Sequence, residues 1–411
     1  MGNVLTLKER NTNDGNSGSC RKGIRGKMRK EIERDMERTM GTGRKNELGR
    51  MIGKKSERAG KRRRGNVWKG TWAAGAAVMM TFSLGMGVLA DEPTSLVVGN
   101  TGNSIKAAMV VLASEMGYYE EEGLDMSFES IASLNDGLTA IDTGKIDILP
   151  LGIIPTVTFV SQGSDFVIFG GTISEGSQAV VTEENKDTIK DLTDYEGKTI
   201  ACVRPETGHM IMEKLIRDAG VDMDTVEFVE MDGFQSVIEA VSKGTADVGF
   251  VNSGFGQVAE QQGLHIAMNV GDYAPDAVCC RQTTSGKVIE EKRDALVKFE
   301  VANLRAMKLA RDDKETTIQK LMDFSGQSEE YVDYCVYADV MKISMDPAKN
   351  RIQDFYEVMD SNGDIPENSQ WDIDKAVDTT IYEDALEEMM EREPEEQMWQ
   401  DLMEAFEENN G

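Results

Sequence analysis

The spacing of apolar residues after position 93 predicts strands that alternate with helices. Short apolar runs, such as SLVVGN, KIDILPLG and DFVIFGG, have the length of buried strands and contain glycine at or near their ends. Between them, apolar residues recur three and four positions apart, as from Ile105 to Met116, which predicts helices with one buried face. Strands that alternate with helices favour an α/β fold with mostly parallel sheets.

A short sequence pattern occurs twice, 100 positions apart. AIDTGKIDI at 140–148 and AVSKGTADV at 240–248 share an alanine, a branched apolar residue, a glycine and an aspartate in the same frame. In each copy the glycine is predicted to end a helix and the aspartate to lead into a buried strand. Either two similar α/β lobes or chance reuse of a common unit explains the match. Because a glycine-containing turn follows each strand, we expect two lobes with a ligand cleft at their strand ends.

The segment RPETGHMIMEKLIRDAG at 204–220 is predicted to be a turn followed by a helix with one apolar face. Thr207, Gly208 and His209 lie where that helix starts. Free N–H groups and a partial positive charge at a helix start favour an anion or a strongly polar ligand. Two simpler interpretations remain open: Thr207 as an ordinary N-cap, and His209 as a solvated helix residue.

Charge divides the chain into a basic N-terminal segment and an acidic remainder. The formal net charge of the whole chain is −28, yet basic residues outnumber acidic ones in residues 1–70. The uncharged stretch at 71–90 follows basic residues and ends in VLA, which is typical of a secretory signal. An uncleaved membrane anchor is the alternative. We therefore expect residues 1–70 to be a disordered basic leader, 71–90 to be a signal h-region or anchor, and the acidic part to be extracytoplasmic.

Composition excludes several function classes for the acidic part. General nucleic-acid binding is excluded, because phosphate backbones are bound by excess positive charge. The chain has two histidines and five cysteines without a C-x-x-C pair, and it shows no nucleophile–base pattern. For Cys279 and Cys280, which lie in an apolar run, buried strand residues are a simpler interpretation than a redox or metal role. We expect no enzyme activity, no metal and no cofactor.

Several segments, taken in order, resemble a known family. They are GYYEEEGLDMSFES, GKIDILPLG, DLTDYEGKTIACVRPETGH, GTADVGFVN and AVDTTIYEDAL. Their order over residues 94–390 is similar to that of bacterial ABC-transporter solute-binding proteins, in the branch for nitrate, sulfonates, taurine and thiamine-precursor pyrimidines. The resemblance implies a two-lobed, type II periplasmic-binding-protein fold, each lobe a mostly parallel sheet with flanking helices. It also implies closure around a small organic solute, which a monomer would deliver to the permease and ATPase subunits of an importer.

The resemblance also implies where the ligand is bound. We expect lobe one to comprise residues 94–177 and 278–411 and lobe two residues 178–277, with strands near 179–182 and 278–281 crossing between them. The family's contacts come from the loop after the first strand, from the turns after the two matched strands, and from a helix start in lobe two. In this sequence these positions are Thr101, Gly102, Asn103, Ser104, Gly152, Ile153, Glu206, Thr207, Gly208, His209, Asn252 and Ser253.

The sequence suggests what kind of ligand the predicted cleft favours and leaves two related functions as alternatives. Glu175, Glu206 and Asp276 are predicted to flank the cleft and to favour a ligand with an amine or a ring nitrogen over a bare anion. Enzymes that make the thiamine pyrimidine resemble the same binding proteins, but they need a cofactor lysine and a cysteine-rich iron motif, of which this chain has only Cys279 and Cys280. A receptor domain for a signalling partner would use the same binding chemistry.

Overall fold

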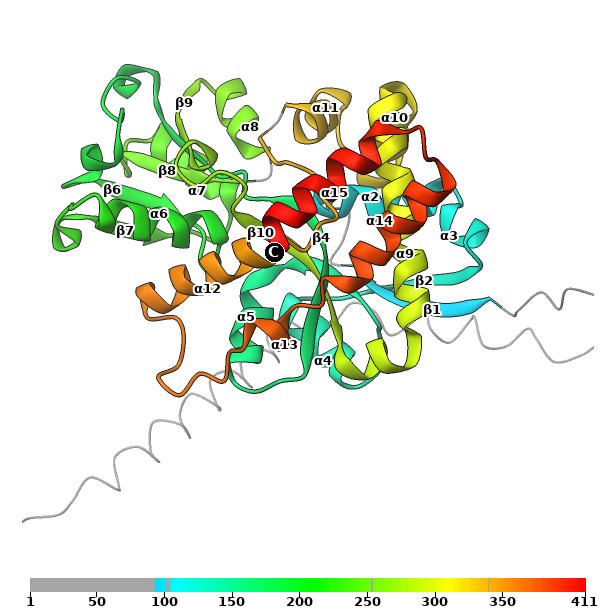
Figure 1. Cartoon of the computed structure of the whole chain (residues 1–411). Helices are drawn as coiled ribbons and strands as arrows, with labels where there is room; N and C mark the ends of the chain where they lie inside the picture. Colours follow the sequence, from blue (N-terminus) through cyan, green and yellow to red (C-terminus); the bar gives the residue numbers. More distant parts are fainter. Residues whose placement is uncertain (1–92, 101–103, 253, 339) are drawn as a thin grey trace, which may run out of the picture. The chain divides into compact units, whose positions relative to one another are not determined.

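The computed structural model describes residues 93–100, 104–252, 254–338 and 340–411 (Figure 1). The predicted leader and the predicted signal or anchor segment at 71–90 lie outside these ranges, as do Thr101, Gly102, Asn103 and Ser253. Within the ranges, no helix combines the length and the apolar character needed to cross a membrane. The described residues form three sheets with flanking helices, which confirms the predicted α/β class.

A first β-α-β-α-β unit has three parallel strands in the spatial order β2-β1-β3. Its elements are β1 (Thr94–Asn100), η1 (Ile105–Ala107), α2 (Ala108–Glu115), α3 (Tyr118–Glu121), β2 (Leu124–Ser130), α4 (Leu134–Asp142), β3 (Leu149–Gly152) and α5 (Ile153–Ser161). The whole length of β1 pairs with β2, and a parallel bridge between Val98 and Ile148 joins β1 to the residue before β3.

A second unit repeats this arrangement in the order β7-β6-β8. Its elements are β6 (Thr199–Cys202), α6 (Thr207–Asp218), η4 (Met223–Thr225), β7 (Glu227–Glu230), α7 (Phe234–Ser242), β8 (Val248–Val251) and α8 (Phe255–Gln261). Strand β6 pairs in parallel with both neighbours. Helices α4 and α7 begin 100 positions apart, at the spacing of the sequence repeat.

The repeated residues make the same backbone contacts in both units. The glycine after each helix is left-handed, with φ of 69° at Gly144 and 68° at Gly244. The aspartate then binds a backbone N–H of the central strand: Asp147 Oδ2 accepts from β1 at 2.8 Å, and Asp247 Oδ2 accepts from β6 at 2.9 Å. The match in sequence therefore corresponds to a match in structure, with the same turn and the same aspartate contact in both units.

Four further strands and three short helices complete the two halves of the fold. They are β4 (Phe166–Ser174), β5 (Gln178–Thr182), η2 (Glu183–Asn185), η3 (Leu192–Tyr195), β9 (Leu264–Asn269), η5 (Val270–Asp272) and β10 (Val278–Ser285). The sheets have the orders β3-β10-β4 and β7-β6-β8-β5-β9.

Most strands of each half run in the same direction, as predicted, and one strand in each half runs against the others. Strand β10 is antiparallel to β3 and β4, and β5 is antiparallel to β8 and β9. The reason is the route of the chain. Parallel neighbours need a long crossover, usually a helix, whereas β5 and β10 each enter from the other sheet through a short connection. These connections are residues 175–177 and 270–277.

The connections lie just before the segments at 179–182 and 278–281 that were predicted to cross between lobes. Each of those segments lies within a single sheet, in β5 and in β10 respectively. The lobe boundaries themselves, 94–177 with 278–411 and 178–277, stay a prediction.

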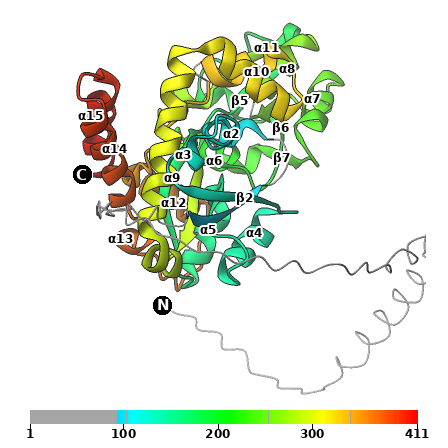
Figure 2. The same cartoon turned by 90° about the vertical axis from the view of Figure 1, so that its right-hand side faces the viewer.

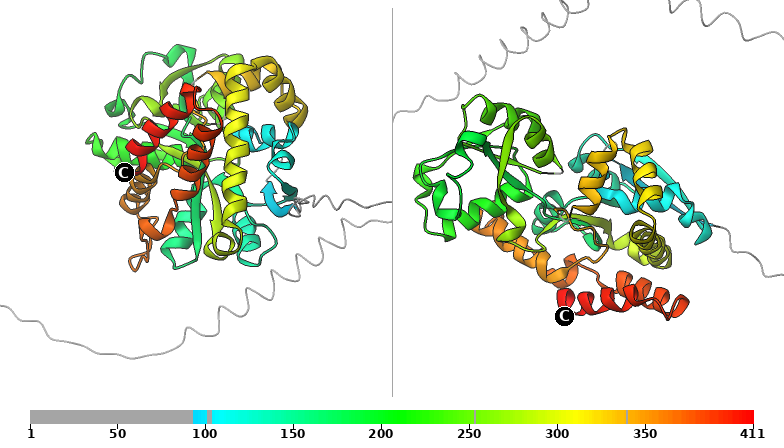
Figure 3. Two further views of the ribbon diagram at one scale, coloured as in Figure 1. Left: turned by 45° about the vertical axis from the view of Figure 1, so that its right-hand side comes forward. Right: turned by 90° about the horizontal axis from the view of Figure 1, so that it is seen from above.

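Helices from the C-terminal third cover the first unit. They are α9 (Gly286–Asp312), α10 (Lys314–Ser325), α11 (Glu329–Tyr337), α12 (Lys349–Asn362), α13 (Ile373–Ala376), α14 (Thr380–Arg392) and α15 (Gln397–Asn410). The long helix α9 packs against α2 and α3 on one side (Figure 2) and against α14 on another, with α15 beside α14 (Figure 3). Buried side chains of this region, such as Phe299 and Trp399, share one apolar core with β1 and α2.

Helix α12 contacts both halves of the fold. It packs against α6 of the second unit and also against α15 and β10 (Figure 1). Arg217 on α6 donates to Asn362 Oδ1 at 3.0 Å, and Asn362 Nδ2 donates to the carbonyl of Met210 at 2.9 Å. Although α12 follows β10 in the chain, it therefore helps to fix the position of α6, which supplies part of the site described below.

Candidate functional site

A cavity of about 320 Å³ lies where strand ends of the two units meet, and we call it the strand-end cavity. The start of η1, the segments that follow β2 and β3, the turn before α6, and β10 form its walls. The residues that line it are Ser104, Lys106, Ser133, Leu134, Gly152, Ile154, Pro155, Pro205, Glu206, Thr207, Cys279 and Cys280. The carboxyl ends of strands are where open α/β sheets hold their ligands.

The predicted binding residues fall into three groups. Four of them, Ser104, Gly152, Glu206 and Thr207, line the strand-end cavity. Four more lie beside or behind this lining and are buried; these are Ile153, Gly208, His209 and Asn252. Thr101, Gly102, Asn103 and Ser253 lie outside the described residues.

Glu206 provides the cap of helix α6. The helix begins at Thr207, and Glu206 Oε2 accepts from the backbone N–H of His209 at 3.1 Å. The alternative in which Thr207 is the N-cap is therefore wrong, and the Thr207 hydroxyl donates to Glu175 Oε2 instead. Since a carboxylate already occupies the helix start, a bare anion brought to this turn would meet negative charge.

Gly208 allows two segments to approach each other closely. A Cβ at this position would lie 2.2 Å from Cβ of Ser177, so any larger residue forces the connection at 175–177 away from α6. The Ser177 hydroxyl donates to Glu206 Oε2 at 3.3 Å across this contact.

His209 is a buried packing residue. The residue is 3% exposed, which contradicts the interpretation as a solvated helix residue. The ring packs edge-on against Phe228, and Nε2 lies 3.1 Å from Nε of Arg204. Burial, and then the Arg204 guanidinium, lower the pKa of His209 to about 3. A neutral imidazole therefore accepts from Arg204, and this side chain is not part of the cavity lining.

Two carboxyl groups meet beside the cavity. Glu175 is 4% exposed, and its Oε1 accepts from the backbone N–H groups of Gly176 and Ser177 at 2.9 and 2.7 Å. Asn252 bridges the pair, because its Nδ2 lies 2.5 Å from Glu206 Oε1 and 3.1 Å from Glu175 Oε1. Burial, and then the charge of Glu206, raise the pKa of Glu175 well above its usual range. The carboxyl of Glu175 therefore holds a proton more readily than that of an ordinary glutamate.

Asp276, the third carboxylate predicted to flank the cleft, lies elsewhere. It is exposed and forms an ion pair with Lys342 at 2.7 Å. The prediction is wrong for this residue because Asp276 belongs to the connection after η5, whose backbone carries the side chain outward to the solvent-exposed Lys342.

Lys106 brings a positive charge into the same cavity. Its Nζ lies 4.0 Å from Cys279 Sγ. Burial opposes its charged form, but the two neighbouring thiols and then Glu206 and Glu175 raise the pKa of Lys106 above its usual value. The strand-end cavity therefore combines an ammonium group from the first unit with a carboxyl pair beside the second. Lys106 was not among the predicted binding residues, although its place two residues after Ser104 was a signal.

Cys279 and Cys280 also line the cavity, although neither was among the predicted binding residues. Both are buried, as expected of strand residues, yet their Sγ atoms lie 3.6 Å apart. Among the described residues, no cluster of three or more histidine, cysteine, aspartate or glutamate side chains is arranged to hold a metal ion.

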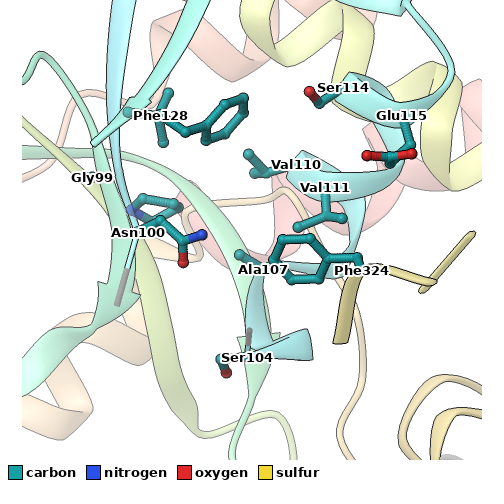
Figure 4. A pocket seen from close by; sticks show the side chains of 12 residues that line it. Gly99, Asn100, Ser104, Ala107, Val110, Val111, Ser114, Glu115, Phe128 and Phe324 are labelled. Carbon is teal, nitrogen blue, oxygen red and sulfur yellow. The ribbon is translucent and has the colours of Figure 1, made fainter. Parts of the chain in front are cut away.

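A second cavity, of about 200 Å³, lies between the first unit and helix α10 (Figure 4). Val110 and Val111 of α2, Phe128 of β2 and Phe324 of α10 give it mostly apolar walls. Ser104 lines both cavities. The second cavity has Asn100, Ser104, Ser114 and Glu115 in its wall but no basic side chain, whereas the strand-end cavity combines Lys106 with Glu206, so it offers groups for both an acidic and a basic part of a solute.

The amino-acid sequence is similar to proteins of two kinds. Residues 104–317 match the family described as NMT1/THI5 like. YtlA of Bacillus subtilis, named as a binding protein, is 21% identical over 311 residues, which are 72% of this chain and 92% of that protein. The 4-amino-5-hydroxymethyl-2-methylpyrimidine phosphate synthase of Candida albicans is 24% identical over 216 residues, 49% of this chain. The chain spans only 62% of the length of that enzyme.

Solved structures with the same fold include periplasmic binding proteins. The aliphatic sulphonate binding protein SsuA of Escherichia coli has a TM-score of 0.57, with 18% identity, 70% of this chain and 92% of that chain covered. The nitrate-binding protein NrtA of Synechocystis PCC 6803 has a TM-score of 0.59, with 16% identity and coverage of 72% and 89%. The predicted two-lobed periplasmic-binding-protein fold is thereby confirmed.

Proposed function

Because the chain belongs to the NMT1/THI5-like family, we propose that it is the solute-binding component of an ABC importer and captures a small organic solute in the strand-end cavity. The observation that carries the proposal is the composition of this cavity, whose polar side chains come from strand ends of both repeated units. A solute that contacts both units favours their closed arrangement, and closure around a solute is how such a protein commits it to a partner.

The proposed partners and location follow from the same role. The loaded protein, a monomer, docks on the permease and ATPase subunits of the importer at the outer face of the cytoplasmic membrane. The basic, apolar and small residues that end at Ala90 support export of the remainder of the chain.

The charges of the cavity favour a solute with both an amine or ring nitrogen and an acidic group. Glu206, with Glu175 and Asn252 behind it, complements N–H donors of the solute, and Lys106 complements a sulfonate or another acceptor. A bare anion such as nitrate would gain from Lys106 but would face the Glu206 carboxylate in a partly buried site, where repulsion is weakly screened. Aminosulfonates and aminopyrimidines fit this description.

Thermal unfolding of the full chain with single solutes tests the proposal. A solute present at about 100 times its Kd adds about 2.7 kcal/mol to the free energy of unfolding. We expect an aminosulfonate or an aminopyrimidine to raise Tm, and nitrate to leave it unchanged. The shift should shrink in Glu206→Gln and Lys106→Met but persist in Glu239→Gln, whose side chain lies on the surface of α7.

The outcomes of this experiment are distinct. A shift with nitrate alone contradicts the proposed solute class but not the binding role. A shift of the same size in Glu206→Gln and Lys106→Met removes the strand-end cavity from the binding of that solute.

A second candidate function is pyrimidine phosphate synthesis. It is favoured by relatives named as synthases and by the lysine and two cysteines that line one cavity. Against it, the cysteine-rich motif that the resemblance calls for is reduced to Cys279 and Cys280. Mass spectrometry of the solute released by denaturing the complex distinguishes the two functions. A binding protein releases its solute with unchanged mass, and an enzyme releases a product of different mass. A receptor for a signalling partner would behave as a binding protein in this test, and co-purification with permease subunits distinguishes it.

A further inference from the structure

Cys279 and Cys280 have an arrangement that a regular strand does not allow. Side chains of neighbouring strand residues point to opposite faces of the sheet. Here the register of β10 against β4 shifts on both sides of Cys280. The irregularity brings the two Sγ atoms to 3.6 Å and turns both side chains to the strand-end cavity.

Charged and polar groups contact this thiol pair from two sides. Lys106 Nζ and Asn252 Nδ2 each lie 4.0 Å from Cys279 Sγ. The hydrogen bond between the thiols lowers the pKa of Cys280 and raises the pKa of Cys279, while burial raises both and Lys106 lowers both. A thiolate is the reactive form of cysteine, and a nearby ammonium group stabilises it.

We propose that Cys279 and Cys280 form a modification site, a neighbouring dithiol that peroxide oxidises to a disulfide within the strand-end cavity. The Cys280 thiolate attacks hydrogen peroxide, which yields a sulfenic acid and hydroxide. The Cys279 thiol then attacks the sulfenic sulfur, the S–S bond forms and water leaves. Two electrons pass from the two sulfurs to the peroxide, and its O–O bond is the bond that breaks.

Such a disulfide is readily reversed. Adjacent Cα atoms are about 3.8 Å apart across a trans peptide, which is below the usual range of roughly 4.4 to 6.8 Å for disulfide-linked residues. The resulting ring is strained, and strained disulfides are the easily reduced ones. The modification therefore acts as a reversible change and not as a permanent cross-link.

Oxidation also alters the groups that face the solute. Closing the bond shortens the S–S separation from 3.6 Å to about 2.05 Å, so Cys279 Sγ moves relative to Lys106 and Asn252. A changed response to solutes would rest on the proposed binding function, but formation of the disulfide does not depend on it.

Peptide mapping of the full chain tests the proposal. The protein is treated with hydrogen peroxide, the excess is removed with catalase, and free thiols are blocked with N-ethylmaleimide in denaturant. Trypsin then releases residues 244–281 as one peptide, which contains Cys279 and Cys280 and no other cysteine. We expect this peptide to carry no maleimide and to be lighter by two hydrogen atoms than its reduced form. Mild dithiothreitol before blocking should restore two maleimide additions.

Matched variants assign the reaction to the pair. Cys280→Ser and Cys279→Ser should lose the internal disulfide, whereas Cys202→Ser, in β6 of the other sheet, should keep it. Two maleimides on the peptide of peroxide-treated wild type, or a disulfide to Cys202 or to Cys335, would overturn the proposal. Because Cys335 shares an apolar cluster with the pair, it is the main alternative partner for a disulfide with either cysteine. The wild-type result decides the matter even if a serine variant fails to fold.

Discussion

The two β-α-β-α-β units have the same backbone plan, yet their matched aspartates lie in different surroundings. Asp147 of the first unit is buried, and Lys292 of α9 binds both of its carboxylate oxygens at 2.9 Å. Asp247 of the second unit makes the same bond to its central strand but is exposed. Local sequence sets the turn in both units, and the helices packed over it determine how strongly the structure depends on each aspartate.

The aspartates should therefore differ most in a test of stability. Asp147→Asn leaves the ammonium of Lys292 largely buried without its carboxylate, and removing one partner of a buried pair costs about 3–5 kcal/mol. Since Lys292 keeps some exposure, we expect a loss of about 2–3 kcal/mol. Asp247→Asn should cost less than about 1 kcal/mol, because water can replace the bond at an exposed site. Urea denaturation of both variants measures the difference.

A double variant identifies the cause. In Asp147→Asn with Lys292→Met no unpaired ammonium group remains, so part of the lost stability should return. Equal losses from Asp147→Asn and Asp247→Asn would mean that the aspartates act only through their backbone bonds, and the comparison of surroundings would fail.

The second difference between the units is a response to pH. The position 100 residues before His209 is Met109, and both side chains are buried. The pKa of His209 is lowered from 6.5 to about 3, so the unfolded chain takes up its proton as pH falls while the folded chain does not. Stability from this group is complete above about pH 6.5 and is lost as pH falls toward 3, by about 2 kcal/mol between pH 7 and 5.

His209→Met gives the second unit the residue that the first unit has. We expect the variant to lose about 2 kcal/mol less stability than wild type between pH 7 and 5. Urea denaturation at the two pH values measures this change in slope, which is separate from any constant cost of the substitution. An unchanged slope would show that another group titrates.

What the sequence predicted depends on how local each feature is. The glycine that ends each helix and the aspartate that follows it act within one turn, and the structure confirmed both. Thr207 was considered as the N-cap of α6, and the structure has Glu206 there instead. This is an error of one residue at a helix boundary, where such predictions are weakest. The antiparallel β5, the contacts of α12 with α6, and the position of Lys106 beside the cysteines depend on contacts between distant segments. No local pattern encodes them.

The site itself shows the same division. Ser104, Gly152, Glu206 and Thr207 were expected in the site from the resemblance to the family, and all of them line the strand-end cavity. The irregular register at Cys280 was not predictable, because strand periodicity alone puts neighbouring side chains on opposite faces.

The third difference concerns charge at the cavity. Lys106 of the first unit and Glu206 of the second lie 100 positions apart and carry opposite charges. For a solute with both an amine and a sulfonate, Lys106→Met and Glu206→Gln should each weaken binding about tenfold, which is about 1.4 kcal/mol. For a simple amine, only Glu206→Gln should weaken binding. Titration calorimetry gives the change in Kd for each of the two variants with each of the two solutes. If both variants weaken binding of the simple amine equally, the charges are not divided between the units in this way.

The smallest effect should be the same in both units. Gly144 and Gly244 have nearly equal positive φ, and no atom lies within 4 Å of a Cβ built at either position. Alanine at each should cost about 1 kcal/mol, because a left-handed backbone is unfavourable for a residue with a side chain. Asparagine tolerates this conformation better and should cost less at both positions. Urea denaturation of Gly144→Ala and Gly244→Ala should give equal losses, since the backbone is identical and neighbouring side chains do not take part. Unequal losses would mean that neighbouring side chains affect the stability of these turns as well. The two copies of the repeat would then differ more than their matching hydrogen bonds suggest.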